Sequence, residues 1–362
     1  MKKPTIAVLG SHSALDVCRG AKDEGFKTLV IAERGRERPY ARYYKTDGGQ
    51  GCVDECMVLP AFSDILTNSV QKQLHAKNVI FIPHRSFEVY LNFNYKAIET
   101  EFDVPMFGNR RLLKIEERGV SPNQYEVLAH ADIRYPKQFT DLQKIDRLCL
   151  VKVLERERGF ERAFFLVKDY KEYLTLTKEK LTHRIITQNQ LSKAVVEEFV
   201  IGAPVNLNFF YSPLSERLEL IGTDTRRQTN IEGIGKIPAL YQEQVLKNIP
   251  LQYEEAGHMA VTILESMLAH VYELGERFVK TTQELYAPGI IGPFALQGII
   301  VPGPPKKEII IVDVSPRMPG SPGISATPYS GYLFGQSMSM GRRVAREIRQ
   351  AISTKQLQKV VT

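Results

Sequence analysis

The sequence of 362 residues contains no tryptophan and only four cysteines, and it has no long uninterrupted apolar run. A membrane-spanning helix needs about 20 mainly apolar residues, so none is expected. Only Cys52 and Cys56 lie close together, and no second cysteine or histidine pair completes a zinc pattern. So few cysteines do not form a disulfide framework in a chain of this size. We therefore expect reduced cysteines and, because no secretory leader is recognisable, a cytoplasmic location.

Negative charge is in short supply: 48 lysine and arginine residues face 41 acidic ones, which gives a net charge of +7 and a pI of about 9.0. An excess of positive charge is typical of proteins that bind anionic ligands, including nucleic acids. The basic residues are scattered along the chain, however, and none of the common nucleic-acid-binding motifs occurs. We expect a phosphorylated small molecule as the partner, with neither nucleic acid nor membrane involved.

The chain length predicts two or three domains. In the first 110 residues, strand-like runs at 4–10, 26–32 and 79–83 and a helical run at 14–24 predict an open parallel α/β sheet. Further strands are predicted at 148–154, 194–201, 206–211 and 218–222. Helices are predicted within 110–131 and 168–195, and at 257–281 and 339–357. This order predicts an α/β domain followed by α+β structure.

The most informative segment runs from Gly292 to Arg317. Two Ile/Val-rich runs flank a turn of proline and glycine, which predicts a β-hairpin. Side chains alternate along a strand, so Gln297 and Asp313 on adjacent strands can share one face with Ser315 and Arg317. Oxygen ligands beside an arginine suit a Mg²⁺-nucleotide, with arginine neutralising phosphate. A buried hairpin that ends in a polar turn explains the same residues without a ligand.

Polar side chains follow two of the predicted parallel strands. Ser11, His12 and Ser13 come after the first strand, and His84, Arg85 and Ser86 come after the strand at 79–83. Loops at the carboxyl ends of parallel strands meet at one cleft, where helix N-termini attract anions. His12 and Ser86 are therefore candidate ligand donors. Helix capping explains the serines but not the imidazole, and a single histidine such as His84 is more often structural.

Charged residues in two later segments also suggest ligand binding. Lys152 interrupts an apolar strand and can reach a phosphate as a point charge, although a lysine on an exposed edge strand is commoner. Together with Glu197 and Glu198 it suggests two walls of an adenine-nucleotide cleft. Arg226 and Asn230, in the polar segment 223–233, can bind phosphate or a carboxamide, but a solvated loop is the simpler interpretation.

Taken together, these motifs resemble one family along the chain from about residue 5 to residue 350. The motifs are Gly10-Ser-His12, Gly35-Arg-Glu-Arg-Pro-Tyr40, Pro83-His-Arg-Ser-Phe87, Val104-Pro-Met-Phe-Gly-Asn-Arg-Arg-Leu-Leu113, Glu197-Glu-Phe-Val200, Asn206, Phe210-Tyr-Ser-Pro213, Asn230-Ile-Glu-Gly233, Gly292-Pro-Phe294 and Met338-Ser-Met-Gly-Arg-Arg343. The sequence resembles the archaeal 5-formaminoimidazole-4-carboxamide ribonucleotide synthetases of purine biosynthesis, in the ATP-grasp superfamily.

The resemblance implies an ATP-grasp fold of mixed α/β and α+β class, in three parts. Residues 1–120 would form an N-terminal parallel α/β domain that binds the substrate. Residues 121–195 would form a small lid subdomain, and residues 196–362 a large subdomain that carries the metal-binding hairpin. The family also suggests a homo-oligomer.

The activity implied is that of an ADP-forming carbon–nitrogen ligase. ATP would convert formate to formyl phosphate, and the amine of aminoimidazole carboxamide ribonucleotide would attack it. The implied cofactors are ATP and Mg²⁺ or Mn²⁺. The implied site residues are His12, Ser86, Arg226 and Asn230 for the ribonucleotide, Lys152, Glu197, Glu198 and Asn206 for ATP, Gln297 and Asp313 for the metal, and Arg317 for the transferring phosphate.

The sequence departs from the family pattern at these sites. The segment 154–162 carries one glycine and three glutamates where the family has a glycine-rich loop over the phosphates. Arg85 stands where glycine is usual, and Asp313 where glutamate is usual. After Arg317 the chain reads Met-Pro-Gly-Ser-Pro-Gly323, where the family usually has a loop that contains glycine and asparagine. Two alternatives therefore remain open: an ATP-grasp ligase for another acid or amine, and a nucleotide-binding paralogue without catalysis.

Overall fold

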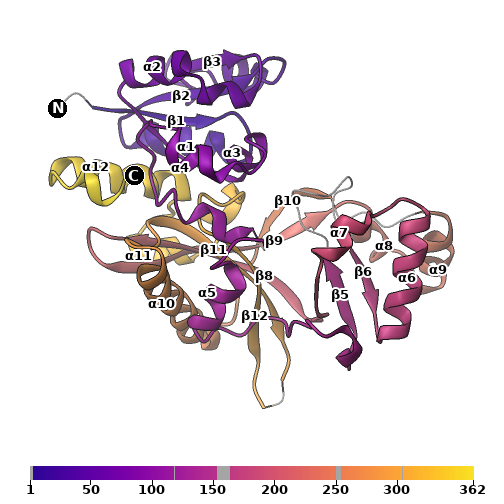
Figure 1. The fold of residues 1–362 in the computed structure, drawn as a ribbon. Helices are drawn as coiled ribbons and strands as arrows, with labels where there is room; N and C mark the ends of the chain where they lie inside the picture. Colours follow the sequence, from indigo (N-terminus) through magenta and orange to yellow (C-terminus); the bar gives the residue numbers. More distant parts are fainter. Residues whose placement is uncertain (1–2, 118, 153–163, 250–253, 304) are drawn as a thin grey trace.

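The computed structural model describes residues 3–117, 119–152, 164–249, 254–303 and 305–362, which form three β-sheets with helices packed on them (Figure 1). The mixed α/β class is as expected, with a parallel sheet first and antiparallel sheets after it. The segment 154–162, which carries the departure from the glycine-rich pattern, lies outside the described residues.

The first sheet is parallel, with the strand order β3-β2-β1-β4. Its strands are β1 (Thr5–Leu9), β2 (Lys27–Glu33), β3 (Glu55–Leu59) and β4 (Val79–Phe81). The helices of this region are α1 (Ala14–Asp23), α2 (Asn68–Ala76), α3 (Arg85–Tyr90) and α4 (Tyr95–Thr100), with short turns η1 (Pro39–Tyr43), η2 (Phe62–Leu66) and η3 (Leu113–Glu116). The strands predicted at 4–10, 26–32 and 79–83 and the helix at 14–24 are confirmed.

A helix from the far end of the chain packs against this sheet. Helix α12 (Met340–Ser353) lies beside α1, below the indigo strands in Figure 1. The two helices approach closely at two glycines: a Cβ on Gly20 would lie 2.1 Å from the backbone nitrogen of Arg342, and one on Gly341 would lie 2.2 Å from the carbonyl oxygen of Asp16. The C-terminal helix therefore joins the first sheet, about 300 residues away in sequence.

The second sheet is antiparallel, with the strand order β10-β9-β8-β11-β12. Its strands are β8 (Ala203–Ser212), β9 (Arg217–Gln228), β10 (Glu255–Ala260), β11 (Gly292–Val301) and β12 (Glu308–Ser315). One face packs against α5 (Gln124–His130) and α10 (Leu268–Leu285) in a core that includes Leu207, Phe209 and Phe294. Because side chains alternate between the two faces of a strand, the residues between these apolar ones lie on the opposite face.

The third sheet, with order β6-β5-β7, is smaller. Its strands are β5 (Cys149–Lys152), β6 (Phe164–Val167) and β7 (Val195–Glu198), and the helices near it are α6 (Tyr170–Thr182) and α7 (Gln188–Ser192). The remaining elements are η4 (Leu142–Lys144), α8 (Ile231–Ile234), α9 (Ala239–Asn248), η6 (Glu265–Met267), η7 (Pro322–Ala326), α11 (Tyr329–Phe334) and η8 (Leu357–Lys359).

Two predictions of local structure are wrong. The helix predicted at 257–281 begins only at Leu268, because residues 255–260 pair with β9 as an edge strand and Gly257 has a φ of +138°, which is not helical. The segment at 223–233 is not a solvated loop: β9 continues to Gln228, and α8 follows. In both places, the pairing of β9 with β10 decided a structure that the local sequence pattern did not predict.

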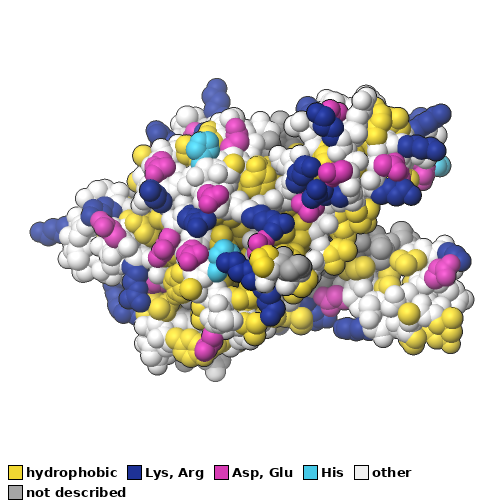
Figure 2. All heavy atoms as spheres, turned by 90° about the horizontal axis from the view of Figure 1, so that it is seen from below, with side chains coloured by type: hydrophobic (Ala, Val, Ile, Leu, Met, Phe, Trp, Pro, Cys, Tyr) yellow, Lys and Arg dark blue, Asp and Glu magenta, His cyan; other side chains and the backbone are white. Residues whose placement is uncertain are grey.

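The structure also bears on the cysteines, on membrane-spanning helices and on the surface charge. All four cysteines are free, and no helix in the described part of the chain is long and apolar enough to cross a bilayer. On the face shown in Figure 2, basic and acidic side chains are interspersed rather than separated into one basic surface.

Candidate functional site

A cavity of about 270 Å³ lies on the polar face of the second sheet, where the loops that follow β1 and β4 reach it. Its lining includes His12 from the loop after β1, Arg85 at the start of α3, and Glu116 from η3. Residues of β8, β9, β11 and β12 form the opposite wall. The cavity therefore lies where the first two sheets meet.

A row of four polar residues crosses this wall of the cavity, which the second sheet forms. Asp224, Asn206, Gln297 and Asp313 lie directly opposite one another on β9, β8, β11 and β12. The next row towards the first sheet contains Asn208, Ala295 and Ser315. The register places Gln297 opposite Asp313, and Ser315 and Arg317 line the same cavity, so these four side chains share one face as the hairpin pattern predicts.

The Gln297–Asp313 end of the row presents unengaged oxygen atoms. Gln297 Nε2 donates to Ser315 Oγ at 3.1 Å, so Gln297 Oε1 points away from that bond. No residue in the described segments pairs with the half-buried carboxylate of Asp313. In the same segments no group of three or more His, Cys, Asp or Glu could hold a metal by itself. Mg²⁺ usually binds one or two carboxylates together with water and substrate phosphates, so two oxygen ligands fit such an ion.

The Asp224 end of the row is fully engaged. Asp224 Oδ2 accepts hydrogen bonds from Asn206 Nδ2 at 2.8 Å and His258 Nδ1 at 2.5 Å, and Oδ1 accepts from Asn208 Nδ2 at 2.6 Å. His258 Nε2 also donates to Glu255 Oε1 at 2.8 Å. Burial by itself would lower the pKa of His258, but these two carboxylates outweigh it and raise the pKa to about 9. Burial opposes ionisation of Asp224, yet the donated hydrogen bonds hold its pKa below the usual value.

The loop after β1 contributes a neutral imidazole. The Ser13 hydroxyl donates to the carbonyl of Pro319, so it accepts from His12 Nδ1 at 2.8 Å and leaves His12 Nε2 as an acceptor. Burial lowers the pKa of His12 well below the usual value, and nearby cations lower it further. His12 Nε2 lies beside Gly320, where a Cβ would come within 2.6 Å of it. His12 can therefore accept a hydrogen bond from a ligand at neutral pH.

The ring of His84 packs against that of His12. The two rings are stacked, with 5.2 Å between their centroids. His84 Nε2 donates to the carbonyl of Leu9 at 3.0 Å, and Nδ1 accepts from the Ser86 backbone N–H at 3.2 Å. Burial lowers the pKa of His84 to about 4, so the ring is neutral. His84 is structural, as expected of a single buried histidine.

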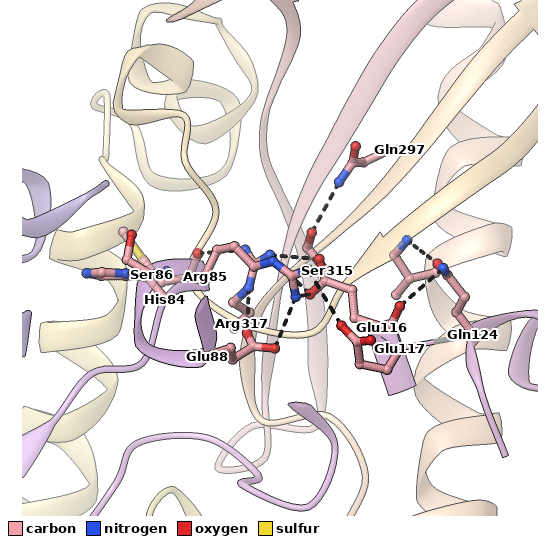
Figure 3. A network of polar contacts seen from close by, with 12 residues as sticks. His84, Arg85, Ser86, Glu88, Glu116, Glu117, Gln124, Gln297, Ser315 and Arg317 are labelled. Atoms are coloured by element: carbon pink, nitrogen blue, oxygen red, sulfur yellow. Dashed lines mark hydrogen bonds and ion pairs between the residues drawn. The ribbon is translucent and has the colours of Figure 1, made fainter. Parts of the chain in front are cut away.

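Arg317 lies in a buried network of charges (Figure 3). Its Nε donates to Glu88 at 3.0 Å, and its Nη2 donates to both carboxylate oxygens of Glu116 at 2.9 and 3.0 Å. Arg85 contacts the same two carboxylates at 3.2 and 3.4 Å and Glu117 at 3.8 Å. Burial raises the pKa of Glu116 to about 8, because its effect exceeds the lowering by Arg317 and Arg85. Three carboxylates share two arginines here, so one proton is readily retained.

Six of the predicted site residues line the cavity. They are His12, Asn206, Arg226, Gln297, Asp313 and Arg317. Ser86 is not among the lining residues but donates to Ser11 Oγ at 3.0 Å, next to His12. Asn230 is also outside the lining: it precedes α8 with a φ of +35°.

The residues predicted for the nucleotide lie in the third sheet. Lys152 forms an ion pair with Glu197, which also accepts from the Tyr125 hydroxyl at 2.7 Å. Glu198 contacts Arg147 at 3.4 Å and accepts from the backbone N–H of Lys137. Neighbouring residues on a strand face opposite sides, so the two glutamates point to different faces of this sheet.

Sequence reasoning missed Asp224, His258 and Glu116. The alternation of polar residues at Asn206 and Asn208, and at Asp224 and Arg226, has the two-residue period of a strand with one polar face, so this signal was present. His258 carried no such signal, because its segment resembled a helix. Glu116 reaches the cavity only through the contact of the first two sheets.

The arrangement of these sheets is the ATP-grasp fold. The ADP complex of an N5-carboxyaminoimidazole ribonucleotide synthetase matches 95% of this chain and 77% of its own with a TM-score of 0.61, at 12% identity. A biotin carboxylase domain of Hydrogenobacter thermophilus in complex with MgADP, ADP and bicarbonate matches 96% of this chain and 70% of its own with a TM-score of 0.60, also at 12% identity. At these identities the likeness concerns the fold alone.

Full-length relatives define the family. The chain is 37% identical over 360 residues to a synthetase of Methanosphaera stadtmanae, covering 99% of this chain and 94% of the relative, and 36% identical over 359 residues to its counterpart in Methanopyrus kandleri, covering 99% and 95%. It belongs to the family of 5-formaminoimidazole-4-carboxamide-1-β-D-ribofuranosyl 5′-monophosphate synthetases. The crystal structure of an IMP biosynthesis protein, PurP, from Thermococcus kodakaraensis covers 99% of this chain and 100% of its own, with a TM-score of 0.70 and 30% identity.

Two family models also match the chain. A "Protein of unknown function (DUF1246)" matches residues 6–139, and a "Domain of unknown function (DUF1297)" matches residues 172–362. Together they cover both the first sheet and the large antiparallel sheet.

Proposed function

We propose that this protein is an ATP-dependent carbon–nitrogen ligase that formylates 5-aminoimidazole-4-carboxamide ribonucleotide in purine biosynthesis. The observation that carries the proposal is the match to the synthetase family over 99% of the chain. The cavity supports it, because it places the loops of the first sheet opposite a row of oxygen ligands on the second.

The proposed reaction has two steps that balance. A formate oxygen attacks the γ-phosphorus of ATP, and ADP leaves. The amine nitrogen of the ribonucleotide then attacks the formyl carbon, inorganic phosphate leaves, and the nitrogen loses a proton. Such steps depend on positioning and on neutralising charge rather than on a protein nucleophile.

Named residues have separate roles in this proposal. Gln297 and Asp313 would hold Mg²⁺ or Mn²⁺, which supplies charge neutralisation for the phosphates of ATP when bound. His12 would accept a hydrogen bond from the ribonucleotide through its bare Nε2, with Ser86 nearby. Arg317 and Arg226 would contribute positive charge at the cavity wall. Lys152, Glu197, Glu198 and Asn206 remain proposed nucleotide contacts, and Asn230 a proposed ribonucleotide contact.

The test is ADP release by the purified protein with ATP, Mg²⁺, formate and the ribonucleotide. We expect ADP and the formylated product to appear in equal amounts, and only when both formate and ribonucleotide are present. ATP hydrolysis that ignores either co-substrate would contradict the proposal.

A second candidate keeps the ATP-grasp chemistry but uses another acid or amine. Arg85 favours it, because this residue lines the cavity and contacts Glu88 and Glu116, and it stands where the family usually has glycine. The same assay with acetate, bicarbonate or an amino acid in place of formate separates the two candidates. A higher kcat/KM with one of these acids would select the second.

The remaining proposals concern organisation. We propose the three-part division at residues 120 and 195, a cytoplasmic location, and a homo-oligomer. Helix α9 supports an assembly, because Leu240 is 81% exposed and Tyr241 53% exposed on a helix with no buried residue. Light scattering after size-exclusion chromatography tests the assembly, and a monomeric mass at micromolar concentration would contradict it.

A further inference from the structure

Two amide oxygens on the cavity wall have a fixed orientation. Asn206 and Asn208 both donate Nδ2 to the carboxylate of Asp224, at 2.8 and 2.6 Å, so their Oδ1 atoms face away from it. In the described segments no residue donates to either Oδ1. Asn208 is only 1% exposed, yet both residues line the cavity. Both oxygen atoms therefore remain available to accept a hydrogen bond from a ligand in the cavity.

These amides keep their orientation only while Asp224 is ionised. A carboxylate has acceptors and no donor, so each neighbouring amide has to turn its NH₂ group towards it. The charge of Asp224 is balanced by His258, whose two ring nitrogens donate to Asp224 at 2.5 Å and Glu255 at 2.8 Å. An imidazole that donates from both nitrogens is an imidazolium, in accord with a pKa raised to about 9.

The groups around His258 form a balanced set. Strand β9 contributes Asp224 and Arg226, strand β10 contributes Glu255, and neutral His12 stands across the cavity. Turn η7, which also packs against β10, carries no titratable side chain. Two carboxylates face two cations, so deprotonation of His258 would leave one negative charge in excess and remove a donor from Asp224.

We infer that the Asp224–His258 ion pair is a positioning device for substrate specificity: it holds Asn206 and Asn208 as acceptors for an N–H group of the amine substrate. Under the proposed function, on which the choice of ligand rests, that group belongs to the amine or the carboxamide of the ribonucleotide. Two amides that present only their oxygen atoms accept an N–H group of a carboxamide and disfavour a carboxylate in its place, because two sets of lone pairs then face each other.

The experiment compares two ligands by isothermal titration calorimetry. The probes are 5-aminoimidazole-4-carboxamide ribonucleotide and its 4-carboxylate analogue. We expect the wild-type protein to bind the carboxamide about 10- to 100-fold more tightly, which is the usual effect of a hydrogen bond involving an unmatched buried group. In Asp224→Asn, one neighbouring amide can turn and donate, so the preference for the carboxamide is expected to collapse to a few-fold. Asn248→Asp is the matched control, since Asn248 is exposed on α9 and its side chain donates only to the carbonyl of Gln244.

A second measurement does not depend on the proposed function, because it follows the ligand-free protein. The imidazole resonances of His258 in the ligand-free wild-type protein, assigned with His258→Gln, are followed by NMR from pH 5 to 10. We expect a midpoint near 9. A midpoint near the ordinary 6.5 would overturn the ion pair and with it the inference.

The outcomes distinguish a failure of this inference from a failure of the proposed function. If both ribonucleotides bind with equal affinity, the inference fails and the proposed function stands. If neither binds while the NMR midpoint is near 9, the proposed function fails and the assignment of the N–H ligand fails with it.

Discussion

Two aspartates at opposite ends of one row have opposite environments. Asp224 and Asp313 lie on β9 and β12, in a row that spans four strands and roughly 14 Å at the usual strand spacing. Asp224 is 1% exposed and accepts three side-chain hydrogen bonds, two on Oδ2 and one on Oδ1, whereas Asp313 is half-buried and has no partner among the described residues.

The two environments predict different roles for the two carboxylates. A carboxylate whose two oxygen atoms both accept hydrogen bonds from neighbouring side chains holds those side chains in place. A half-buried carboxylate without a partner is destabilising until something binds to it. We therefore expect changes at Asp313 to affect activity, and changes at Asp224 to affect stability and substrate preference.

The largest effect is expected for Asp313→Asn. Removing the charge of a proposed metal ligand should lower the rate of ADP formation roughly 1,000-fold, because the metal supplies several kcal/mol of stabilisation in such reactions. Stability in urea should not fall, since no contact of the folded protein is lost. Full activity in this variant at saturating Mg²⁺ would remove Asp313 from the metal site.

For Asp224→Ala, the main effect is expected on stability. This change leaves His258 as a buried cation with one carboxylate and leaves two amides without an acceptor, so stability should fall by about 3 kcal/mol. Urea denaturation followed by circular dichroism measures the change. The hydroxyl of Ser212 and the carboxylate of Glu347 form another buried hydrogen bond at 2.6 Å, and neither residue lines the cavity. Ser212→Ala therefore serves as the control and is expected to cost about 1 kcal/mol. Equal losses in the two variants would show that Asp224 has no special role.

The pH dependence of stability should sharpen the comparison. The pKa of His258 is raised from 6.5 to about 9 in the folded protein. Its contribution is therefore fully present below pH 6.5 and is lost as the pH rises to about 9, on the order of 2 kcal/mol in total. Urea midpoints at pH 6, 7.5 and 9 for wild type and His258→Gln measure it, and the difference between the two proteins should shrink with rising pH. A difference that is constant over this range would contradict a protonated His258.

The smallest effect is expected for Glu116→Gln, on the Asp313 side of the cavity. The pKa of Glu116 is raised from 4.5 to about 8, so its protonated form contributes stability below pH 4.5 that is lost as the pH rises through 8. Glutamine cannot ionise, so relative to wild type the variant should gain stability as the pH rises from 5 to 8.5. Thermal melts at the two pH values give the sign, and Glu265→Gln, on the exposed turn η6, is the control. A relative loss on raising the pH would show that Glu116 is ionised in the fold.

Much of the candidate site could be predicted from local pattern. The hairpin of β11 and β12 was evident because a proline- and glycine-rich turn separates two Ile/Val runs, and strand alternation then placed Gln297 and Asp313 together. His12 was found because loops at the carboxyl ends of parallel strands converge. The full-length resemblance to the synthetases, now shown by relatives at 37% identity, rested on motifs in their order along the chain.

Other parts could not be predicted because they depend on contacts distant in sequence. The strand at 255–260 forms only by pairing with β9, so His258 was placed in a helix and its partnership with Asp224 was not foreseen. The ion pairs of Arg317 with Glu88 and Glu116 were not foreseen either, because these glutamates lie about 200 residues earlier in the chain.

The sequence by itself determined the class of fold, the hairpin and the pairing of Gln297 with Asp313 on it, because strand alternation and turn chemistry act over a few residues. The tertiary structure alone decided which carboxylates are engaged and which are exposed to a ligand. That distinction depends on the number of donors around each carboxylate, and those donors come from strands and loops that meet only in the folded chain.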